Sequence, residues 1–402
     1  MERTDVPAMA RGYTAEMKVL MICNTDGAMF VFRKPLLEGL IRLGHEVISV
    51  TPDGPYRPRI EKLGVRTRVI PIPQYALSPV TNLLLFFRLL GILLSERPDI
   101  VHSFTHKPAI FGTIAAFLAR VPRRFITITG LGRTFIREDL QTRIVRRVLV
   151  LQYRLACRLA STVFFQNPED LALFTSRRIV KRDAALLTYG SGVDIDGLRP
   201  PREAEIATAR DLIAQELGRP VTGKRIVLLP ARALPEKGIL EFYQAARLIQ
   251  RESSDFVFIH LGIVSEDPKD PLNSRRLQEL ASESTVHHLG FRDNLADYMA
   301  GVDIVALPSA REGMPRTLLE ALAMGKCIVT TDVPGCRLAV RDGWNGFLCR
   351  FGDPESLARS LLNVDDAMIH ECKVRSRAHC ESLFSAAALV DLTFGRYFAS
   401  HG

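Results

Sequence analysis

The feature that most constrains the fold of this chain is a repeated alternation of short apolar runs with longer segments of helical spacing. The run MKVLMICN (residues 17–24) is apolar almost throughout and ends at a polar loop, which is typical of a parallel strand buried on both faces. A segment of helical spacing, Pro35–Leu43, follows it, with Gly44 as a candidate C-cap, and HEVISV is the next apolar run. This order predicts a parallel sheet covered by helices on both faces.

The alternation continues in two blocks along the chain. We expect further strands at residues 65–72, 99–103, 125–129 and 162–166, and then at 225–230, 255–261, 285–289, 303–307 and 327–331. A polar region at 194–222, which carries Pro200 and Pro201, separates the blocks. Because 402 residues exceed one ordinary core, we predict two doubly wound, Rossmann-like α/β domains that face each other across a cleft. Their expected bounds are 17–195 and 196–383, and a C-terminal helix in 384–402 is expected to pack back on the first domain.

Composition indicates a globular protein with reduced thiols. Hydrophobic residues make up 47% of the chain. The seven cysteines show no CxxC spacing, which argues against a disulfide framework and against a zinc site. The first sixteen residues are polar and carry no apolar signal core. We therefore expect a cytoplasmic location and no bound metal.

Positive charge is concentrated in one stretch. Residues 117–182 contain 14 Arg or Lys and 4 Asp or Glu, whereas the net charge of the whole chain is +9. Such a basic stretch attracts nucleic acid or anionic lipid. Nucleic acid is disfavoured because the stretch has no recognised binding motif and few aromatic residues. An anionic membrane surface and a general richness in arginine both stay open as explanations.

The segment NLLLFFRLLGILLS (residues 82–95) is strongly apolar and is interrupted only by Arg88. Its length is below the ~20 residues that a bilayer-spanning helix needs, so we expect that it does not cross a membrane. A buried crossover helix and an interfacial helix that dips into the membrane are the two interpretations.

Two carboxylates stand eight positions apart after the predicted strand at 303–307. Glu312 follows the strand run GVDIVALPSA, and Pro315 suits the first turn of a helix that would contain Glu320. The start of such a helix, at Met314–Thr317, directs backbone N–H groups and a positive dipole end toward a phosphate. Two acids beside a phosphate site suit a ligand rich in hydroxyl groups, such as a nucleotide sugar; solvated surface acids are the alternative.

Two further loops follow predicted strands. Arg232 and Lys237 lie five positions apart in ARALPEKG, where a guanidinium fork and an ammonium can converge on one diphosphate. Gly27, after the first strand, allows the backbone to approach a ligand closely. No GxGxxG occurs in that loop, which argues against a nicotinamide-binding domain.

Taken together, these motifs resemble family 4 glycosyltransferases. The similarity rests on EGMPRTLLEALAMGKCIVTTDVPGC, with its Glu-x7-Glu pattern, on the Arg-x4-Lys of ARALPEKG and on YGSGVD at residues 189–194. The matches run through residues 17–355 in the family's order. The resemblance implies a GT-B architecture and a retaining sugar transfer that needs no metal or other cofactor. The pair Arg337-Leu338 departs from relatives that often have an acid here, which leaves outer contacts of the site open.

The resemblance also implies roles for particular residues. Arg232 and Lys237 would neutralise the diphosphate leaving group, Glu320 would bind the ribose diol and Glu312 the hydroxyls of the donor sugar. Neither glutamate is expected to be a nucleophile.

Other donor contacts are implied in the same way. Backbone amides of the segment Gly313, Met314, Arg316 and Thr317 would hold the distal phosphate. The loop with Gly290 and Phe291 would hold the base, which we expect to be uracil.

The family carries a histidine that touches the donor sugar after a strand of the first domain. His102 and His106 both stand near the end of DIVHSF, and we prefer His106 because it lies deeper in the loop. A structural role satisfied by the backbone stays open for both.

FITITGLG, THKPAIFG and FQNPEDL are similar to a subgroup that acts on polyprenyl-diphosphate-linked sugars. We therefore predict transfer of an N-acetylhexosamine or hexose from a UDP-sugar to a lipid-linked or polysaccharide acceptor, at the inner face of the cell membrane. A UDP-sugar 2-epimerase of the same fold and a non-catalytic sugar-nucleotide-binding protein at the membrane surface are the alternatives.

Overall fold

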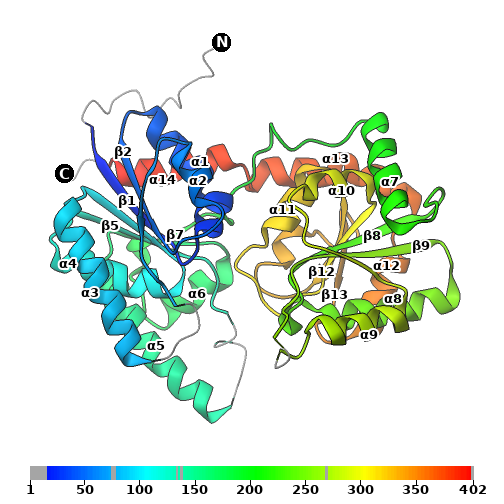
Figure 1. Cartoon of the computed structure of the whole chain (residues 1–402), viewed down its shortest axis with the longest axis horizontal. Coiled ribbons are helices and arrows are strands. Elements are labelled where there is room, and N and C mark those ends of the chain that lie inside the picture. The colour runs from blue at the N-terminus through cyan, green and yellow to red at the C-terminus, as the bar shows by residue number, and fades with distance from the viewer. Residues whose placement is uncertain (1–15, 74–77, 133–134, 136–138, 268–269, 400–402) are drawn as a thin grey trace. The chain divides into compact units, whose positions relative to one another are not determined.

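A computed structural model describes residues 16–73, 78–132, 135, 139–267 and 270–399 (Figure 1). The predicted polar character of the first residues thus falls, except for Glu16, outside the described part. The chain divides into unit 1, Met1–Gly192 with Ala386–Gly402, and unit 2, Val193–Ser385. The boundaries predicted from the sequence are 195/196 and 383/384.

Unit 1 contains a seven-stranded sheet in which every paired strand is parallel. The strand order is β3-β2-β1-β4-β5-β6-β7, which changes direction between β1 and β4. The strands are β1 (Lys18–Ile22), β2 (Glu46–Thr51), β3 (Arg66–Val69), β4 (Ile100–Phe104), β5 (Arg123–Ile128), β6 (Thr162–Phe165) and β7 (Ala185–Leu187). Its helices are α1 (Asp26–Arg42), α2 (Arg57–Glu61), α3 (Pro79–Glu96), α4 (Thr113–Leu118), α5 (Leu140–Leu159), α6 (Pro168–Ser176) and α14 (Ala386–Tyr397), with a π-helical turn at Pro108–Gly112.

Burial on both faces of this sheet explains the unbroken apolar run of β1. Val19 and Met21 belong to a core cluster with α1 and α14, whereas Leu20 and Ile22 belong to another with α3 and α4. The C-terminal helix α14, red in Figure 1, lies beside the blue α1. There, a Cβ at Gly39 would come within 2.9 Å of the Phe394 ring.

The first helix begins earlier than the sequence suggested. The expected segment was Pro35–Leu43, but α1 begins at Asp26 and holds Pro35 in its interior. The Thr25 side chain caps the helix by accepting a hydrogen bond from the Ala28 amide at 2.9 Å. This cap, and not the proline, sets the start.

Unit 2 contains a six-stranded parallel sheet of order β10-β9-β8-β11-β12-β13, which changes direction between β8 and β11. The strands are β8 (Arg225–Pro230), β9 (Phe256–Leu261), β10 (His287–Gly290), β11 (Ile304–Leu307), β12 (Cys327–Thr331) and β13 (Gly346–Cys349). The helices are α7 (Glu203–Leu217), α8 (Ile239–Glu252), α9 (Ser274–Ser284), α10 (Leu295–Gly301), α11 (Arg316–Ala323), α12 (Pro354–Leu362) and α13 (Asp366–Leu383). The two parallel sheets confirm the doubly wound α/β class.

The polar region expected to separate the domains belongs to unit 2. It forms α7, which buries Ala209 and Ile213. Arg210 of this helix makes an ion pair of 2.7 Å with Asp303, and the Asp303 carboxylate also accepts from the Ile226 amide of β8. The helix is therefore fixed to the sheet and is not a free linker.

Helix α3 is longer than the predicted segment 82–95. It has 18 residues with a mean hydropathy of 1.4, so by length and composition it is the one described helix that could span a bilayer. The predicted length of the helix was therefore wrong, and the expectation that it does not cross a membrane stays a prediction. One face packs in the core through Leu85, Leu89 and Leu93. Another face exposes about half of each of Leu84, Phe87 and Leu94.

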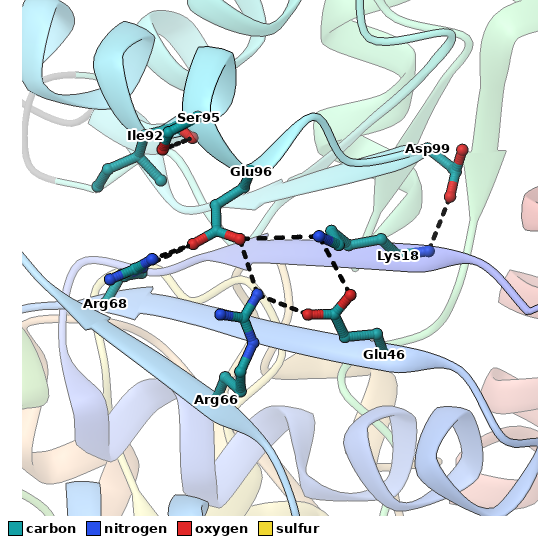
Figure 2. A network of polar contacts seen from close by, with 8 residues as sticks. All are labelled: Lys18, Glu46, Arg66, Arg68, Ile92, Ser95, Glu96 and Asp99. Atoms are coloured by element: carbon teal, nitrogen blue, oxygen red, sulfur yellow. Dashed lines mark hydrogen bonds and ion pairs between the residues drawn. The ribbon is translucent and has the colours of Figure 1, made fainter.

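Figure 2 shows a charged network at the amino ends of β1, β2 and β3. Glu96, at the end of α3, is buried and accepts hydrogen bonds of 2.7 Å from both Arg66 and Arg68. Lys18 and Arg66 also contact Glu46. This network attaches the end of α3 to the edge of the sheet.

We expect Glu96→Gln to lower the free energy of unfolding at pH 7 by on the order of 1–3 kcal/mol, because the amide has no charge, keeps only one acceptor oxygen and turns an NH2 group toward the second guanidinium. Burial raises the pKa of Glu96, but the hydrogen bonds from Arg68 and Arg66 outweigh it and leave this pKa lowered. A lowered pKa means that the stabilisation is present above the ordinary glutamate value and disappears as pH falls through the folded-state pKa. Urea unfolding should therefore show a difference from wild type that shrinks on acidification. Glu38→Gln, at an exposed pair with Lys34, is the matched control and should change little.

Candidate active site

The motifs of unit 2 lie at the edge where its sheet changes direction. The loops after β8 and β11 contain Arg232 with Lys237 and Glu312 with Met314, respectively. Since β8 and β11 are parallel neighbours, both loops leave from the same carboxyl edge. Open α/β sheets bind ligands at this kind of switch point.

Direct contacts join these two loops. The Lys237 ammonium donates to Glu312 Oε1, and the two side chains keep 21% and 14% exposure. The Ala310 amide donates to the Glu236 carbonyl at 2.8 Å. Residues 75 positions apart in sequence thus form one site. Arg232 is exposed and makes no ion pair within the described parts of the chain.

Two glycines with positive φ allow the backbones to come this close. Gly238 has φ +72, and a Cβ there would lie 2.1 Å from the Pro308 carbonyl oxygen. Gly335 has φ +81, and a Cβ would lie 2.6 Å from the carbonyl oxygens of both Glu312 and Gly313. The Glu312 amide also donates to Pro334 at 3.1 Å. The position of Glu312 therefore depends on a turn that follows β12.

Helix α11 begins one residue later than Pro315, which is its N-cap. Its internal hydrogen bonds begin with the Leu318 amide donating to the Pro315 carbonyl, so the first-turn amides, including that of Thr317, lie at the open end of the helix. Glu320 lies about one turn further and accepts from Arg316 Nε at 2.9 Å. Burial raises the pKa of Glu320, although Arg316 opposes this shift.

The loop expected to hold the base follows β10. Gly290 has φ +75, and its carbonyl accepts from the Gly262 amide at 2.9 Å. Phe291 exposes 53% of its surface. Arg292 donates to Glu216 at 2.9 Å and to the Tyr298 hydroxyl at 3.0 Å, which fixes the loop to α7 and α10.

The side chain that supports the Arg232 loop was not predicted from the sequence. His260, near the carboxyl end of β9, is fully buried; one ring nitrogen contacts the Ala231 carbonyl at 2.9 Å and the other the Tyr243 hydroxyl at 3.1 Å. Burial lowers the pKa of His260 to about 4, so the ring is neutral at pH 7. A histidine inside the apolar run FVFIHL was the available signal.

In unit 1, the predicted residues also follow the two strands at which the order changes direction. Gly27 lies in the first turn of α1 after β1, where its amide donates to Asp26 Oδ1 at 2.8 Å. A Cβ on Gly27 would lie 3.3 Å from the Tyr56 ring. The glycine thus packs against a neighbouring loop, and its contact with a ligand stays a prediction.

The structure separates the two candidate histidines. His102 lies inside β4 with 1% exposure, and its ring contacts the Tyr397 hydroxyl at 2.5 Å and the Thr127 hydroxyl at 2.7 Å. Both nitrogens are used, so His102 is a core residue. His106 lies in the loop after β4, where Nδ1 contacts the Tyr153 hydroxyl at 3.0 Å.

The His106 loop has two unusual features. Thr105 adopts φ +70, which is rare for a β-branched residue, and a π-helical turn begins at Pro108. Burial, aided by Lys107, lowers the pKa of His106 to about 4, so its ring is neutral at pH 7. A neutral ring fixed by Tyr153 can exchange hydrogen bonds with a sugar hydroxyl.

Comparison with known proteins agrees with this geometry. Residues 31–190 match the model of a glycosyl transferase 4-like domain, and residues 224–365 match that of glycosyl transferases group 1. The chain is 29% identical, over 88% of its length and 91% of the relative's, to the N,N'-diacetylbacillosaminyl-diphospho-undecaprenol alpha-1,3-N-acetylgalactosaminyltransferase of Campylobacter jejuni. It is 25% identical, over 83% and 86%, to the UDP-Gal:alpha-D-GlcNAc-diphosphoundecaprenol alpha-1,3-galactosyltransferase of Escherichia coli.

Solved structures show the same fold. The Anabaena protein HepE, in complex with UDP and glucose, superposes with a TM-score of 0.74 at 20% identity, over 94% of this chain and 98% of HepE. With both family models, the two parallel sheets and the joined loops of unit 2 in agreement, the chain belongs to the family 4 glycosyltransferases and has the GT-B fold.

Proposed function

We propose that this enzyme transfers a hexose or N-acetylhexosamine, with retention, from a UDP-sugar to a polyprenyl-diphosphate-linked or polysaccharide glycan. The observation that carries the proposal is the contact between Lys237 and Glu312, because it joins a diphosphate-binding motif to a sugar-binding motif at a switch point. The names of the two relatives both include a diphosphoundecaprenol-linked acceptor, and one names UDP-Gal as donor. These names support the acceptor class and the nucleotide.

The transition state separates positive charge on the sugar from growing negative charge on the diphosphate. Arg232 and Lys237 supply cations for the diphosphate, and the open end of α11 supplies amides. Glu312 lies beside Lys237 and would bind the sugar, while Glu320 would accept the ribose hydroxyls. The departing phosphate oxygen would deprotonate the acceptor on the same face, so no protein base is required. For unit 1, a donor contact of His106 and of Gly27 stays a prediction of the family resemblance.

A panel of UDP- and GDP-sugars, each incubated with a lipid-linked acceptor, tests the proposal. We expect transfer from one UDP-sugar, with the anomeric configuration retained by NMR. The same NMR experiment without acceptor addresses the 2-epimerase alternative, since only an epimerase converts the UDP-sugar itself. Conversion without acceptor, or UDP binding with no transfer to any acceptor, would contradict the proposal.

We further propose that unit 1 attaches to the anionic inner face of the cell membrane. The exposed side of α3 carries Leu84 and Phe87. Helix α5 contains five arginines and no acidic residue, and it also exposes a row of apolar residues, namely Leu140, Ile144, Val148, Leu151 and Leu155. Arginine next to exposed apolar side chains is the composition of an interfacial helix.

Sedimentation with vesicles tests the attachment. The wild-type protein should sediment with vesicles that contain anionic lipid, and salt should release it. Leu84→Asp with Phe87→Asp should weaken vesicle binding at least about tenfold, because both side chains lose their apolar contact with lipid. Leu383→Asp with Val374→Asp, at exposed positions of unit 2, is the control and should bind normally. Vesicle binding that survives both salt and the α3 substitutions would refute this route.

A further inference from the structure

Helix α3 also borders an apolar groove in unit 1, through side chains other than those in the core. The groove has a volume of about 500 Å³ and lies between α3, the π-helical turn and α5, all on the blue-to-green side of the colour range in Figure 1. Leu83 and Phe86 line it from α3, and Val145 and Val148 line it from α5. Its volume is within the range of small-molecule sites. Leu84 and Phe87, which the vesicle test replaces, do not line it, whereas Ile144 and Val148 of the exposed row on α5 border it.

We propose that this groove binds the isoprenoid chain of the acceptor, in the part that adjoins the diphosphate. The inference rests on the proposed function, because it assigns a seat to the acceptor of that reaction. It differs from membrane attachment, since the groove would recognise a single chain when no bilayer is present.

The charge and polarity of the lining favour such a chain. Among the described residues that line the groove there is no Asp or Glu, and the cation Lys107 lies at the groove with 7% exposure. An apolar wall with a nearby cation suits an apolar chain that ends in a diphosphate. A peptide is less suited because it brings a backbone N–H and C=O at every residue, which need more partners than the few polar side chains of the described lining, such as Asn82 and Gln152, can supply.

The place of the groove in the fold gives the chain a direction. Lys107 and His106 both line the groove and belong to the loop after β4, at the edge where the sheet changes direction. The same loop carries the histidine that the family resemblance assigns to the donor sugar. A chain in the groove would therefore hold its diphosphate end near the loop where transfer is expected, and its distal end away from it.

The test uses isoprenyl diphosphates in solution without vesicles. Calorimetry should show that farnesyl diphosphate binds at least about tenfold more tightly than methyl diphosphate, because the added chain is buried. Val145→Trp, which fills the groove, should remove this gain and leave methyl diphosphate binding unchanged. Val374→Trp, an exposed valine of α13, is the matched control and should keep the gain. Leu83→Asp, at a half-exposed position, provides a second groove variant with little risk to folding.

The outcomes separate this inference from the proposed function. Two results would overturn the groove assignment even if sugar transfer occurs. One is equal affinity of the wild type for farnesyl and methyl diphosphate, and the other is a preference for farnesyl diphosphate that both groove variants retain. A chain-length gain that both groove variants lose would support the groove even if no donor sugar is transferred. In a working transfer assay, the groove further predicts that KM falls as the isoprenoid of a soluble acceptor is lengthened, and that Val145→Trp abolishes this trend.

Discussion

Replacing Lys237 with alanine is expected to lower kcat roughly 10³-fold while the protein stays folded. The reason is that the ammonium would face the diphosphate, where charge grows during sugar departure, so its contribution is larger in the transition state than in the ground state. Steady-state transfer with saturating UDP-sugar measures the effect. The substitution should leave the fold intact, because Lys237 lies in a partly exposed loop and not in the core.

Lys224→Ala is the matched control for this substitution. Lys224 precedes the other end of the same strand, β8, and lies 4.0 Å from Asp255. Its removal should change kcat less than about twofold, because exposed pairs contribute little. Adding Glu312→Gln to Lys237→Ala should cost less than the two single losses multiplied together, since the two residues act on one donor. A normal kcat in Lys237→Ala would contradict the site assignment.

Replacing Glu320 with alanine should have the second-largest effect, a rise of roughly 10²-fold in the KM for the donor. A carboxylate that accepts two ribose hydroxyls contributes charge-assisted hydrogen bonds in both the ground state and the transition state. Loss of this binding therefore appears in KM more than in kcat. Glu283→Ala, at an exposed position of α9, is the control and should leave KM unchanged. A Glu320→Ala enzyme with normal KM would remove the residue from the donor site.

The pH dependence of the donor KM gives an independent test of Glu320. Burial raises the pKa of this carboxyl, so on acidification it takes up its proton at a higher pH than an ordinary glutamate does. The protonated group is a poorer hydrogen-bond acceptor. On acidification, the donor KM of the wild type should therefore begin to rise at a pH higher than that at which an ordinary glutamate titrates. Glu320→Gln cannot titrate and should lose this part of the profile. An identical profile in both proteins would show that Glu320 does not contact the donor as a carboxylate.

Local sequence predicted the elements whose signals are local. The apolar runs before the loops of Gly27, Arg232 and Glu312 are strands because both faces of each sheet are buried. Strand β13 was missed because it begins with a glycine, which is not typical of a strand. Gly346, with φ +149, is required there because its backbone approaches the Ile328 carbonyl of β12, and that contact cannot be read from the local sequence. Strand β7 was missed because three residues at a sheet edge carry no periodicity. Two predicted strands differ from the observed edge strands in their bounds. The strand predicted at 65–72 is shorter in the structure, as β3, and the one predicted at 285–289 is shifted toward the C-terminus, as β10.

The site was predicted as separate motifs, whereas its assembly depends on contacts far apart in sequence. Nothing near Lys237 indicates that Glu312 is its partner, and nothing near His106 indicates Tyr153. The glycine that supports Glu312, Gly335, follows a different strand. The length of α3 was underestimated although the local sequence carries the signal for its start. Ser78 is a favourable N-cap, and Pro79 suits the first position of a helix.

The contacts of α14 bear on the order in which the protein can fold during synthesis. Tyr397 completes the hydrogen bonds of His102, and Phe394 packs against Gly39, so the core of unit 1 includes residues from both ends of its sequence. Unit 2 is encoded entirely between them. As the chain leaves the ribosome, unit 2 therefore has all its residues available before unit 1 does. Unit 1 must keep an unfinished core, with the His102 side chain lacking its Tyr397 partner, until the last helix emerges.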